Sequence, residues 1–374
     1  MPALTKAQKK LAQAAEDSFN RTYAARFGEE RWQQSLYPAL TAPTRYAALA
    51  NRFTVADLDT VFSQEQLAKL QTIAFPVVSD LPGSKPLLSY QWDVSEAETT
   101  FPQPQPNASS DLLTHWNLDA ASLLAVSILG PKPGDKVLDL CAAPGGKSVA
   151  LSQFLRGDDY NSASPSLGGG CLHSNEVNTG RNKRLASNLQ EYLPEVFFKT
   201  GEVKVLKLDG AEPSSVQTLP LGPGGYDKVL LDAPCSSERH VIHAHAKAKQ
   251  GGRAADEMTS WRSGQSKKMA KTQVALLMTA LKAVRVGGRV LYATCSLSCD
   301  ENDAVVEKAM ELVQKERKKF GTKWDFTVRS SELGASGLEG WAELTKSGWL
   351  VLPDHPCGGK WGPLFFALLE RIET

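Results

Sequence analysis

Helical periodicity dominates the first part of the chain. In the stretches ALTKAQKKLAQAAEDSF and SQEQLAKLQTIAF, apolar residues recur at the spacing of one helix face. Residues 1 to about 88 are therefore expected to form helices broken by turns. No internal repeat is evident along the sequence.

The helical pattern ends in a segment rich in proline, serine and threonine. This segment, EAETTFPQPQPNASSD, runs from Glu96 to Asp111. Such a composition favours a linker or an extended arm over regular structure. We therefore expect two parts: residues 1–111 as a helical N-terminal region with a proline-rich arm, and residues 112–374 as a larger domain.

From residue 112 onward, short apolar runs alternate with helical patterns. The strand candidates are Lys136–Cys141, Cys171–Glu176, Val203–Asp209, Lys228–Asp232 and Arg289–Thr294, and GPLFFALLER near the C-terminus reads as a last strand. The helix candidates are Ser148–Leu155, Asn182–Leu193, Lys267–Val284 and Glu301–Glu316. This alternation predicts an α/β fold with a mostly parallel, doubly wound sheet.

Polar side chains mark the ends of these expected strands. Cys141, Glu176, Asp209, Asp232 and Cys295 each lie at or just past a carboxyl end. Ligands of such sheets bind outside the carboxyl ends, near the point where the strand order reverses. The pattern therefore places a candidate site at this edge of the sheet.

Composition indicates a globular protein but does not indicate what it binds. The 374 residues are 42% hydrophobic and 22% charged, as in ordinary globular proteins. No apolar run approaches the ~20 residues needed to cross a bilayer. The formal net charge is +1, so any nucleic-acid site must come from local clusters of lysine and arginine. The N-terminus carries Glu16 and Asp17 and little serine, which favours a solvated helix over an organelle transit peptide.

The cysteines indicate chemistry more than structure. They are Cys141, Cys171, Cys235, Cys295, Cys299 and Cys357, without a Cys-x-x-Cys pair, so a structural zinc site is not expected. Nothing resembles a secretory signal, so reduced intracellular thiols are expected. Cys235 and Cys295 end the strand candidates in VLLDAPCSSERH and LYATCSLS. Either one alone is more typical of a buried strand cysteine, but two at equivalent positions favour a reactive pair.

The stretch VLDLCAAPGGKS, Val137–Ser148, reads as a cofactor loop. Gly145 and Gly146 allow close backbone approach to a ligand, and the following helix offers free amides at its N-terminus. The loop is neither Gly-x-Gly-x-x-Gly nor a phosphate-binding P-loop, which disfavours hydride and phosphoryl transfer. Glu176 suits the two hydroxyls of a ribose and Asp209 suits the amine of adenine. Each carboxylate alone is more typical of a surface or capping residue, but together they favour a nucleoside cofactor.

Three motifs carry a resemblance to a known family. DLCAAPGGK, DAPCS and TCSLS, in this order, resemble those of the Sun-domain (NSUN) family of RNA cytosine-5 methyltransferases, and LDAASLLAV resembles the helix before its cofactor motif. The resemblance implies a class I (Rossmann-like) methyltransferase sheet over residues 112–374, with an antiparallel last strand and S-adenosylmethionine as cofactor. Glu176 departs from the commoner aspartate but keeps the charge. The implied cofactor residues are Cys141, Ala142, Ala143, Pro144, Gly145, Gly146, Lys147, Glu176, Arg181, Asp209, Gly210 and Asp232.

The same resemblance distinguishes the two cysteines. A thiolate that adds to carbon 6 of cytosine makes carbon 5 nucleophilic enough to take a methyl group. The proline–cysteine step of DAPC alone, as in DNA cytosine-5 methyltransferases, would choose Cys235 as the attacking residue. The resemblance instead implies Cys295 as nucleophile and Cys235 as the residue that helps release the product. It also implies that Asp232 contacts the cytosine and that Lys147 holds the base or the Asp232 carboxylate.

The segment after Cys235 is basic. Residues Glu238–Lys271 contain eight lysines or arginines against three acidic residues, together with Gly251, Gly252 and Gly264. A target base must leave its stack to reach the site, and contacts of lysine and arginine with phosphate groups would bind the RNA. We therefore expect a mobile basic lip over the site, with a solvated loop as the alternative.

The resemblance is strongest to the short mitochondrial members of the family. DAPCSSERH, FNRTYAARFGEERW and RYAALANRF are similar to their segments. They imply an RNA substrate, no membrane, and a mitochondrial location, with cytoplasm or nucleus as alternatives. One branch methylates small-subunit ribosomal RNA with a helical-repeat partner of the mitochondrial termination-factor family, and another a transfer RNA. The N-terminal similarity favours ribosomal RNA, with residues 1–111 as a candidate contact for RNA or the partner.

Two further classes of function remain as alternatives. One is a non-catalytic RNA-binding or ribosome-assembly factor that keeps the fold, which the intact pair Cys235 and Cys295 with Asp232 disfavours. The other is methylation of DNA or protein. The order of the motifs disfavours DNA, and the basic segment with the two cysteines disfavours protein.

Overall fold

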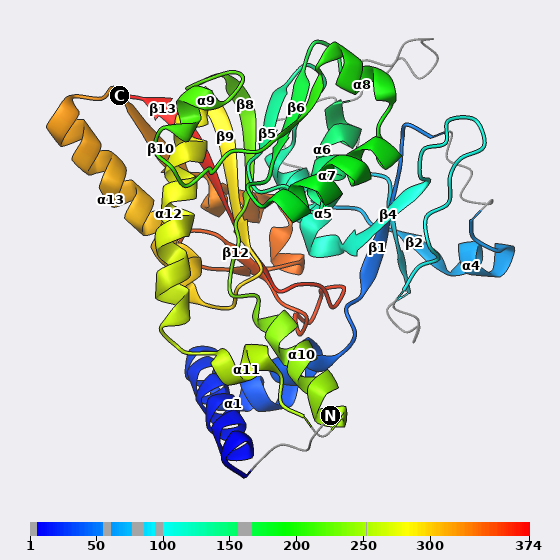
Figure 1. Ribbon diagram of the computed structural model, residues 1–374, viewed down its shortest axis with the longest axis vertical. Coiled ribbons are helices and arrows are strands. Elements are labelled where there is room, and N and C mark those ends of the chain that lie inside the picture. The colour runs from blue at the N-terminus through cyan, green and yellow to red at the C-terminus, as the bar shows by residue number, and fades with distance from the viewer. Residues whose placement is uncertain (1–5, 55–60, 77–85, 94–99, 156–166, 252) are drawn as a thin grey trace.

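A large mixed sheet forms the centre of the molecule (Figure 1). The computed structural model describes residues 6–54, 61–76, 86–93, 100–155, 167–251 and 253–374. The strand order is β11-β12-β13-β9-β8-β5-β6-β7, and β10 also pairs with β13. The strands are β5 (Lys136–Asp139), β6 (Cys171–Asn175), β7 (Val203–Leu206), β8 (Tyr226–Asp232), β9 (Val284–Thr294), β10 (Trp324–Val328), β11 (Glu343–Leu344), β12 (Trp349–Val351) and β13 (Leu364–Glu373).

The half of this sheet from β7 to β9 is parallel, and β13 pairs with β9 in the antiparallel direction. The predicted mostly parallel sheet with an antiparallel last strand is therefore confirmed. The sequence pattern did not indicate β10, β11 and β12, which extend the antiparallel half. From β5 the chain continues to β6 and β7 on one side of the sheet and then to β8 and β9 on the other. The carboxyl end of β5 is therefore the topological switch point, where ligands of such sheets bind.

Helices cover both faces of the sheet because successive strand residues point to opposite sides. Val137 of β5 packs with α5 (Ala120–Leu129) and α6 (Gly146–Leu155) in one hydrophobic cluster. Leu138, the next residue, packs with α12 (Gln265–Ala283) and α13 (Asp303–Phe320) in a second cluster. The remaining helices of this part are α7 (Thr179–Tyr192), α8 (Glu195–Thr200), α9 (Ser215–Thr218), α10 (Glu238–Gln250) and α11 (Asp256–Ser260).

The N-terminal region combines helices with a small antiparallel sheet. The first predicted helix is present as α1 (Lys6–Phe27), and α2 (Glu29–Arg31), a π-helical turn (Trp32–Leu36) and α3 (Tyr37–Thr41) follow it. The second is present only as α4 (Gln64–Lys69), because the next residues of the predicted helix, 70–72, pair with β3 as a strand. The sheet, in the order β2-β3-β1-β4, was not predicted. Its strands are β1 (Tyr46–Ala50), β2 (Leu70–Thr72), β3 (Ser89–Trp92) and β4 (His115–Asp119). Pairing of β1 with β4 crosses the predicted boundary at residue 111.

The expected proline-rich arm lies partly outside the described residues, which omit 94–99. From Thr100 to Asp111 the chain has no helix, and Pro106 forms an isolated bridge with Leu113. Asp119 ends β4 and caps α5, because its Oδ1 accepts a hydrogen bond from the backbone N–H of Ala121 at 2.8 Å. The N-terminal sheet is thus joined directly to the first helix of the larger domain.

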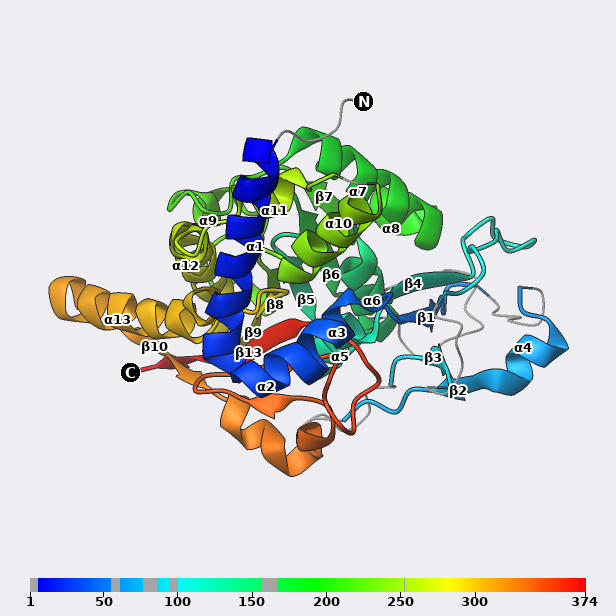
Figure 2. The same cartoon turned by 90° about the horizontal axis from the view of Figure 1, so that it is seen from below.

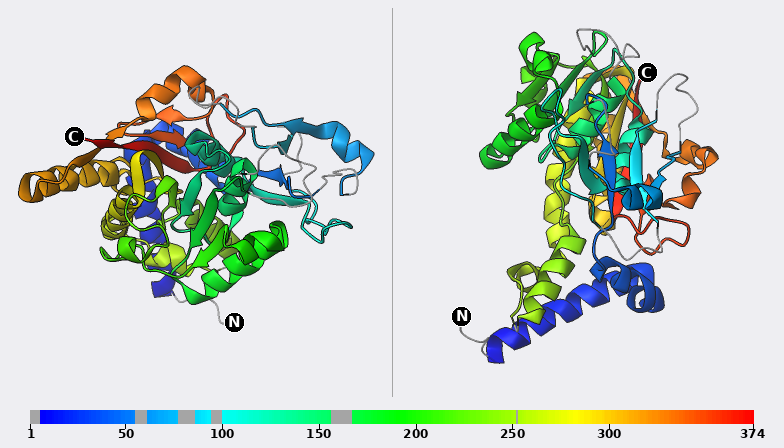
Figure 3. Two further views of the ribbon diagram at one scale, coloured as in Figure 1. Left: turned by 90° about the horizontal axis from the view of Figure 1, so that it is seen from above. Right: turned by 90° about the vertical axis from the view of Figure 1, so that its right-hand side faces the viewer.

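The basic segment Glu238–Lys271 is largely helical over its described residues, so the alternative of a solvated loop is wrong there, and the expected mobile lip stays a prediction. It forms α10, α11 and the start of α12, and Gly252 lies outside the described residues. The physical reason is a helical pattern of buried side chains, Val241, Ile242 and His245, on the face of α10. α1 and α3 lie against α11 and α10, and together they form a lobe below the sheet (Figures 2 and 3).

Aromatic rings fill the interior of this lobe. The ring of Phe19 on α1 lies 4.8 Å from that of Tyr23 and 5.1 Å from that of Trp261, which follows α11. Tyr23 also stacks on Trp32 at 5.4 Å. Of the helices that the structure describes, none is long and apolar enough to span a membrane.

Candidate active site

The loop between β5 and α6 is shaped by two glycines. Gly145 has a φ of +121°, which a residue with a Cβ rarely adopts, and Gly146 packs under Trp116 so closely that a Cβ would lie 2.7 Å from its Nε1. The Pro144 carbonyl accepts a hydrogen bond from Asn188 Nδ2 at 2.7 Å. The loop is therefore held against Trp116 of β4 and Asn188 of α7, and its role as a cofactor loop stays a prediction.

Asn175, at the end of β6, ties three strand ends together. Its Nδ2 donates to the carbonyls of Leu140 and Leu208 at 3.0 Å, and its Oδ1 accepts from the Leu208 N–H at 2.8 Å. These bonds fix the positions of the carboxyl ends of β5, β6 and β7 relative to one another. Asn175 was not predicted as a site residue, although it stands directly before Glu176.

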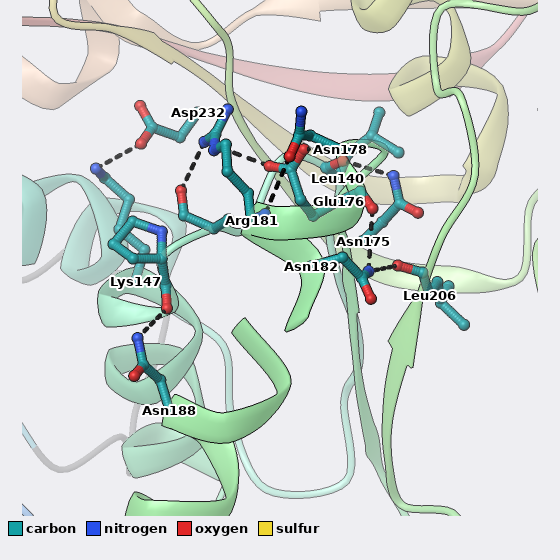
Figure 4. Close-up of polar contacts among 12 residues, drawn as sticks. Leu140, Lys147, Asn175, Glu176, Asn178, Arg181, Asn182, Asn188, Leu206 and Asp232 are labelled. Carbon is teal, nitrogen blue, oxygen red and sulfur yellow. Dashed lines mark hydrogen bonds and ion pairs between the residues drawn. The ribbon is translucent and has the colours of Figure 1, made fainter. Parts of the chain in front are cut away.

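Glu176 is oriented by the start of α7 (Figure 4). Its Oε1 accepts the backbone N–H of Asn178 at 2.8 Å, and its Oε2 lies 3.3 Å from Arg181 Nη2. Arg181 also donates to the Ala143 carbonyl at 2.9 Å, and so links the β6 end to the cofactor loop. The buried carboxylate and the guanidinium thus form one connected wall.

A cavity of about 410 Å³ opens at these strand ends. It is lined by nine of the predicted site residues: Cys141, Ala143, Glu176, Arg181, Asp209, Gly210, Asp232, Cys235 and Cys295. A second cavity of about 240 Å³ adjoins it through Cys141 and Asp232, and its lining adds Ala142, Pro144, Gly146 and Lys147. Gly145 lines neither cavity, because it faces Leu185 and Asn188 of α7.

Asp139 also lines the second cavity, although the sequence pattern gave it no role. Its Oδ2 accepts a hydrogen bond from Ser148 Oγ at 2.7 Å, whereas its buried Oδ1 has no well-formed hydrogen bond to any described residue. Burial, offset in part by Ser148, and the nearby charge of Asp232 raise the pKa of Asp139 to about 7. A buried carboxylate oxygen without a donor suits a cationic group of a ligand.

Lys147 and Asp232 form an ion pair between the two cavities. Lys147 Nζ lies 2.7 Å from Asp232 Oδ2 (Figure 4). Burial alone would lower the pKa of Lys147, but the charge and hydrogen bond of Asp232 raise it overall. The lysine is therefore charged and directed at the carboxylate, as one of its two predicted roles requires.

The two cysteines that end β8 and β9 lie side by side. Cys235 Sγ is 3.0 Å from Cys295 Sγ, and both are free thiols. The hydrogen bond between them lowers the pKa of Cys295 and raises that of Cys235, and burial opposes the first change and adds to the second. The Ser237 hydroxyl lowers the pKa of Cys295 further. Cys295 is thus the thiol that ionises more readily.

A buried glutamate, Glu238, lies behind the cysteine loops. Its Oε2 accepts the Leu297 N–H at 2.8 Å, and its Oε1 accepts the Tyr23 hydroxyl of α1 at 2.6 Å. Ser236 and Ser296, which follow the two cysteines, both contact the same Oε1. Glu238 therefore connects both cysteine loops with the N-terminal helix.

A second buried glutamate, Glu301, meets the same serines. Its Oε2 accepts the Ser236 N–H at 3.0 Å and the Gln273 side-chain amide at 2.9 Å, while its Oε1 contacts Ser236 Oγ and Ser296 Oγ. Both glutamates are fully buried. Neither was predicted, because nothing in the sequence indicates that residues 63 positions apart meet.

The hydroxyl of Ser236 lies between the two glutamates. Ser236 Oγ lies 2.5 Å from Oε1 of Glu238 and 2.5 Å from Oε1 of Glu301, but its hydroxyl carries only one hydrogen. A hydrogen bond to each therefore requires one carboxyl to be protonated and to donate to the serine. Burial raises the pKa of Glu238, although hydrogen bonds from Ser236 and Tyr23 oppose it, and the charge of Glu301 raises it further. Glu238 is therefore the carboxyl to test for a bound proton.

Comparison with known proteins identifies the family. Residues 126–332 match the family described as 16S rRNA methyltransferase RsmB/F. The chain belongs to this family. Two relatives are each 31% identical to it: the 5-cytosine rRNA methyltransferase NSUN4 of Bos taurus over 79% of this chain and 73% of the relative, and the mitochondrial tRNA (cytosine(34)-C(5))-methyltransferase of Danio rerio over 99% and 90%. The resemblance found in the sequence is thereby confirmed.

Solved structures agree on the fold of this RsmB/F-family chain. NSun6 from Pyrococcus horikoshii with SFG has a TM-score of 0.60 at 14% identity, over 96% of this chain and 98% of the other. A methyltransferase homologue from Pyrococcus horikoshii has a TM-score of 0.57 at 19% identity, over 98% and 99%. The predicted class I methyltransferase fold is confirmed.

Proposed function

We propose that this RsmB/F-family chain transfers a methyl group from S-adenosylmethionine to carbon 5 of a cytosine in RNA. The observation that carries the proposal is the pair Cys235 and Cys295, 3.0 Å apart beside the Lys147–Asp232 ion pair and the larger cavity. A lone cysteine in a cavity would fit many chemistries. Two thiols with opposite pKa shifts fit addition to a ring carbon followed by release of the adduct.

The residues present fit S-adenosylmethionine. Its α-ammonium suits the buried Oδ1 of Asp139, which lacks a donor, and its ribose and adenine suit the carboxylates of Glu176 and Asp209 in the 410 Å³ cavity. Ala142, Gly146 and the rest of the loop would hold its remaining polar groups through their backbone. When bound, this cofactor supplies an electrophilic methyl group.

The reactive side chains have distinct roles. The Cys295 thiolate attacks carbon 6 of the cytosine, forming a carbon–sulfur bond and moving electron density to carbon 5 and the ring nitrogen. As charge grows on that nitrogen, the ion pair supplies it with a proton, from the Lys147 ammonium through Asp232. After methylation, the carbon 5–carbon 6 double bond re-forms as the carbon–sulfur bond breaks. Cys235 assists this release, because it gives its proton to the departing Cys295 sulfur and, as a thiolate, takes the proton from carbon 5. The intact set argues against a non-catalytic factor with the same fold.

Ribosomal RNA is the substrate we propose first, and a transfer RNA is the second candidate. NSUN4 proteins of cattle and mouse are rRNA methyltransferases by name and are 31% identical to this chain. The observation that favours transfer RNA is coverage, since the mitochondrial tRNA enzymes of zebrafish and mouse match 98–99% of the chain. The tRNA relatives are mitochondrial by name, which supports a mitochondrial location, and a helical-repeat protein partner stays a prediction.

The test is to trap the covalent adduct. Cys235→Ala protein, incubated with S-adenosylmethionine and total cellular plus organelle RNA, should give a slowly migrating protein–RNA species on a denaturing gel. The species should disappear in the Cys235→Ala/Cys295→Ala double variant, and sequencing of the trapped RNA names the substrate. An adduct with Cys295→Ala instead would exchange the two cysteine roles, and methyl transfer to DNA or protein alone would overturn the RNA assignment.

A further inference from the structure

A third cavity, of about 390 Å³, adjoins the reactive groups. Lys147, Asp232 and Cys295 form one wall of it, and Asp232 and Cys295 also line the 410 Å³ cavity assigned above to the cofactor. Its volume is in the range of a site for one small ligand, about 300 to 1,000 Å³. A group placed here can therefore reach Cys295 without occupying the cofactor cavity.

Asp119, Ala121 and Ser122 at the junction of β4 and α5 also line the cavity, and the remaining walls come from three segments far apart in the sequence. These are Thr44 and Tyr46 around the start of β1, Ser237, Arg239, His240 and His243 around the start of α10, and residues 362–364 around the start of β13. In Figure 2 the N-terminal helix α3 lies alongside α10, next to the loop that leads to β13. The N-terminal region is thus part of this cavity and not an appendage beside it.

Arg239 joins these three segments. The guanidinium is buried, and it donates hydrogen bonds to the carbonyl of Gly362 and, at 3.2 Å, to that of Ala42. His243 Nε2 lies 2.8 Å from the Leu40 carbonyl, to which it donates. Gly362 N–H in turn donates to Asp119 at 3.0 Å. The segment before β1 is therefore held in a fixed position over the cavity.

Tyr46 stands out in its strand. It is 38% exposed, whereas the other four residues of β1 are at most 1% exposed. Its side chain lines both this cavity and the 240 Å³ cavity next to Lys147. An exposed ring beside a lysine, two histidines and a carboxylate fits a ligand with one flat face and several polar groups, which describes a nucleotide better than an aliphatic molecule.

We propose that this cavity receives the flipped target nucleotide and that Tyr46, supplied by the N-terminal region, packs its ring against the base. Arg239 is the positioning residue that holds Tyr46 and the loop at Gly362 around it. The inference rests on the proposed function, because it takes Cys295 as the residue that the base must reach. A flipped base loses its stacking contacts with the neighbouring bases, and stacking on an aromatic side chain replaces those contacts.

The test compares three substitutions in the Cys235→Ala background with total RNA and S-adenosylmethionine. Tyr46→Ala should slow adduct formation at limiting RNA by about tenfold, whereas Tyr46→Phe, which keeps the ring, should stay within about threefold. Tyr90→Ala is the matched control, because Tyr90 is half-buried on β3 of the same small sheet and does not line the cavity. It should also stay within about threefold.

Cofactor affinity, measured by calorimetry, distinguishes weaker nucleotide binding from a damaged fold. It should be the same in Tyr46→Ala and its parent. Adduct formation by Tyr46→Ala at the parent rate, or equal reductions in Tyr46→Ala and Tyr90→Ala, would overturn the role of Tyr46. If the parent itself traps no RNA, the proposed function fails, and this inference fails with it.

Discussion

At the scale of single residues, Asp139 shows how burial prepares a group for a ligand. Its carboxyl has a pKa of about 7 and one oxygen without a donor. Below that pH the group is protonated and neutral, and above it the carboxylate can pair with the α-ammonium of S-adenosylmethionine. We expect cofactor affinity to rise as the pH goes from about 6 to 7.5, where the ammonium still carries its proton.

Asp139→Asn should remove this dependence, since an amide does not titrate in this range. At pH 7.5 the variant should bind the cofactor about thirtyfold more weakly, the equivalent of about 2 kcal/mol for a charged hydrogen bond. Calorimetric titration at several pH values measures both effects. Asp135→Asn is the matched control, because Asp135 precedes the same strand, is buried, and lies at the end away from the cavities. A pH slope that persists in Asp139→Asn would show that another group titrates.

Glu238 allows a second test at this scale. If it carries the proton shared with Glu301, glutamine in its place keeps both the neutral charge and a donor toward Ser236. The free energy of unfolding of Glu238→Gln should therefore lie within about 1 kcal/mol of that of the parent. Glu238→Ala leaves the Leu297 N–H and the Tyr23 hydroxyl without an acceptor, and should lose about 3 kcal/mol or more.

Urea unfolding measures these free energies, and infrared spectra of protein with labelled glutamate measure the proton itself. A protonated carboxyl band at neutral pH should be present in the parent and absent in Glu238→Gln. Labelled glutamate is needed because Asp119, Asp135 and Asp139 also have raised pKa values. If the labelled parent shows only carboxylate bands, both glutamates are ionised and neither carries a proton.

At the scale of elements, the helix α1 supports the cysteine loops from a distance. Its Phe19 is fully buried against Tyr23 and Trp261, and Tyr23 donates to Glu238. Phe19→Ala should cost about 3 to 5 kcal/mol of unfolding free energy and should loosen α10, seen as faster amide exchange there. Leu11→Ala on the same helix, at an exposed position, should change stability by less than about 0.5 kcal/mol. Similar destabilisation in both variants would mean that α1 contributes only helix propensity.

The elements also show which secondary structure a sequence pattern can predict and which it cannot. Lys136–Cys141 was predicted as a strand because it is a short apolar run, and β5 covers Lys136–Asp139 of it. Tyr46–Ala50, YAALA, reads as a helix because alanine and leucine favour one. It is a strand because β3 and β4 pair with both of its edges, a tertiary effect that no local pattern contains.

The same limit applies to the site. Glu176, Asp209 and the two cysteines could be predicted because strand ends in a parallel sheet converge on one edge. Glu238, Glu301 and Tyr46 could not, since each reaches the site by packing between segments far apart in the chain. DAPCSSERH and RYAALANRF, which contain Glu238 and Tyr46, resemble segments of the family, but the sequence does not indicate that these two residues lie at the site.

At the scale of the whole molecule, a nearly neutral protein must still hold an RNA. Lysines on the first turns of α12 are the best-placed group, because Lys267, Lys268 and Lys271 are exposed and the next residue, Thr272, lines the 410 Å³ cavity. Changing all three lysines to glutamate should weaken binding of a small-subunit ribosomal RNA transcript by about tenfold or more. It should also reduce the salt dependence, by about 0.7 to 0.9 in the slope for each phosphate that the variant no longer neutralises.

Fluorescence anisotropy over a series of salt concentrations measures both quantities. The matched control is the triple change to glutamate at Lys315, Lys318 and Lys319, exposed lysines in the second half of α13 that line none of the three cavities. Net charge falls equally in the two triple variants, so long-range repulsion of the RNA is matched. Equal weakening in both would attribute binding to overall charge, whereas weakening confined to the α12 variant would place the RNA along the helix that borders the cofactor cavity.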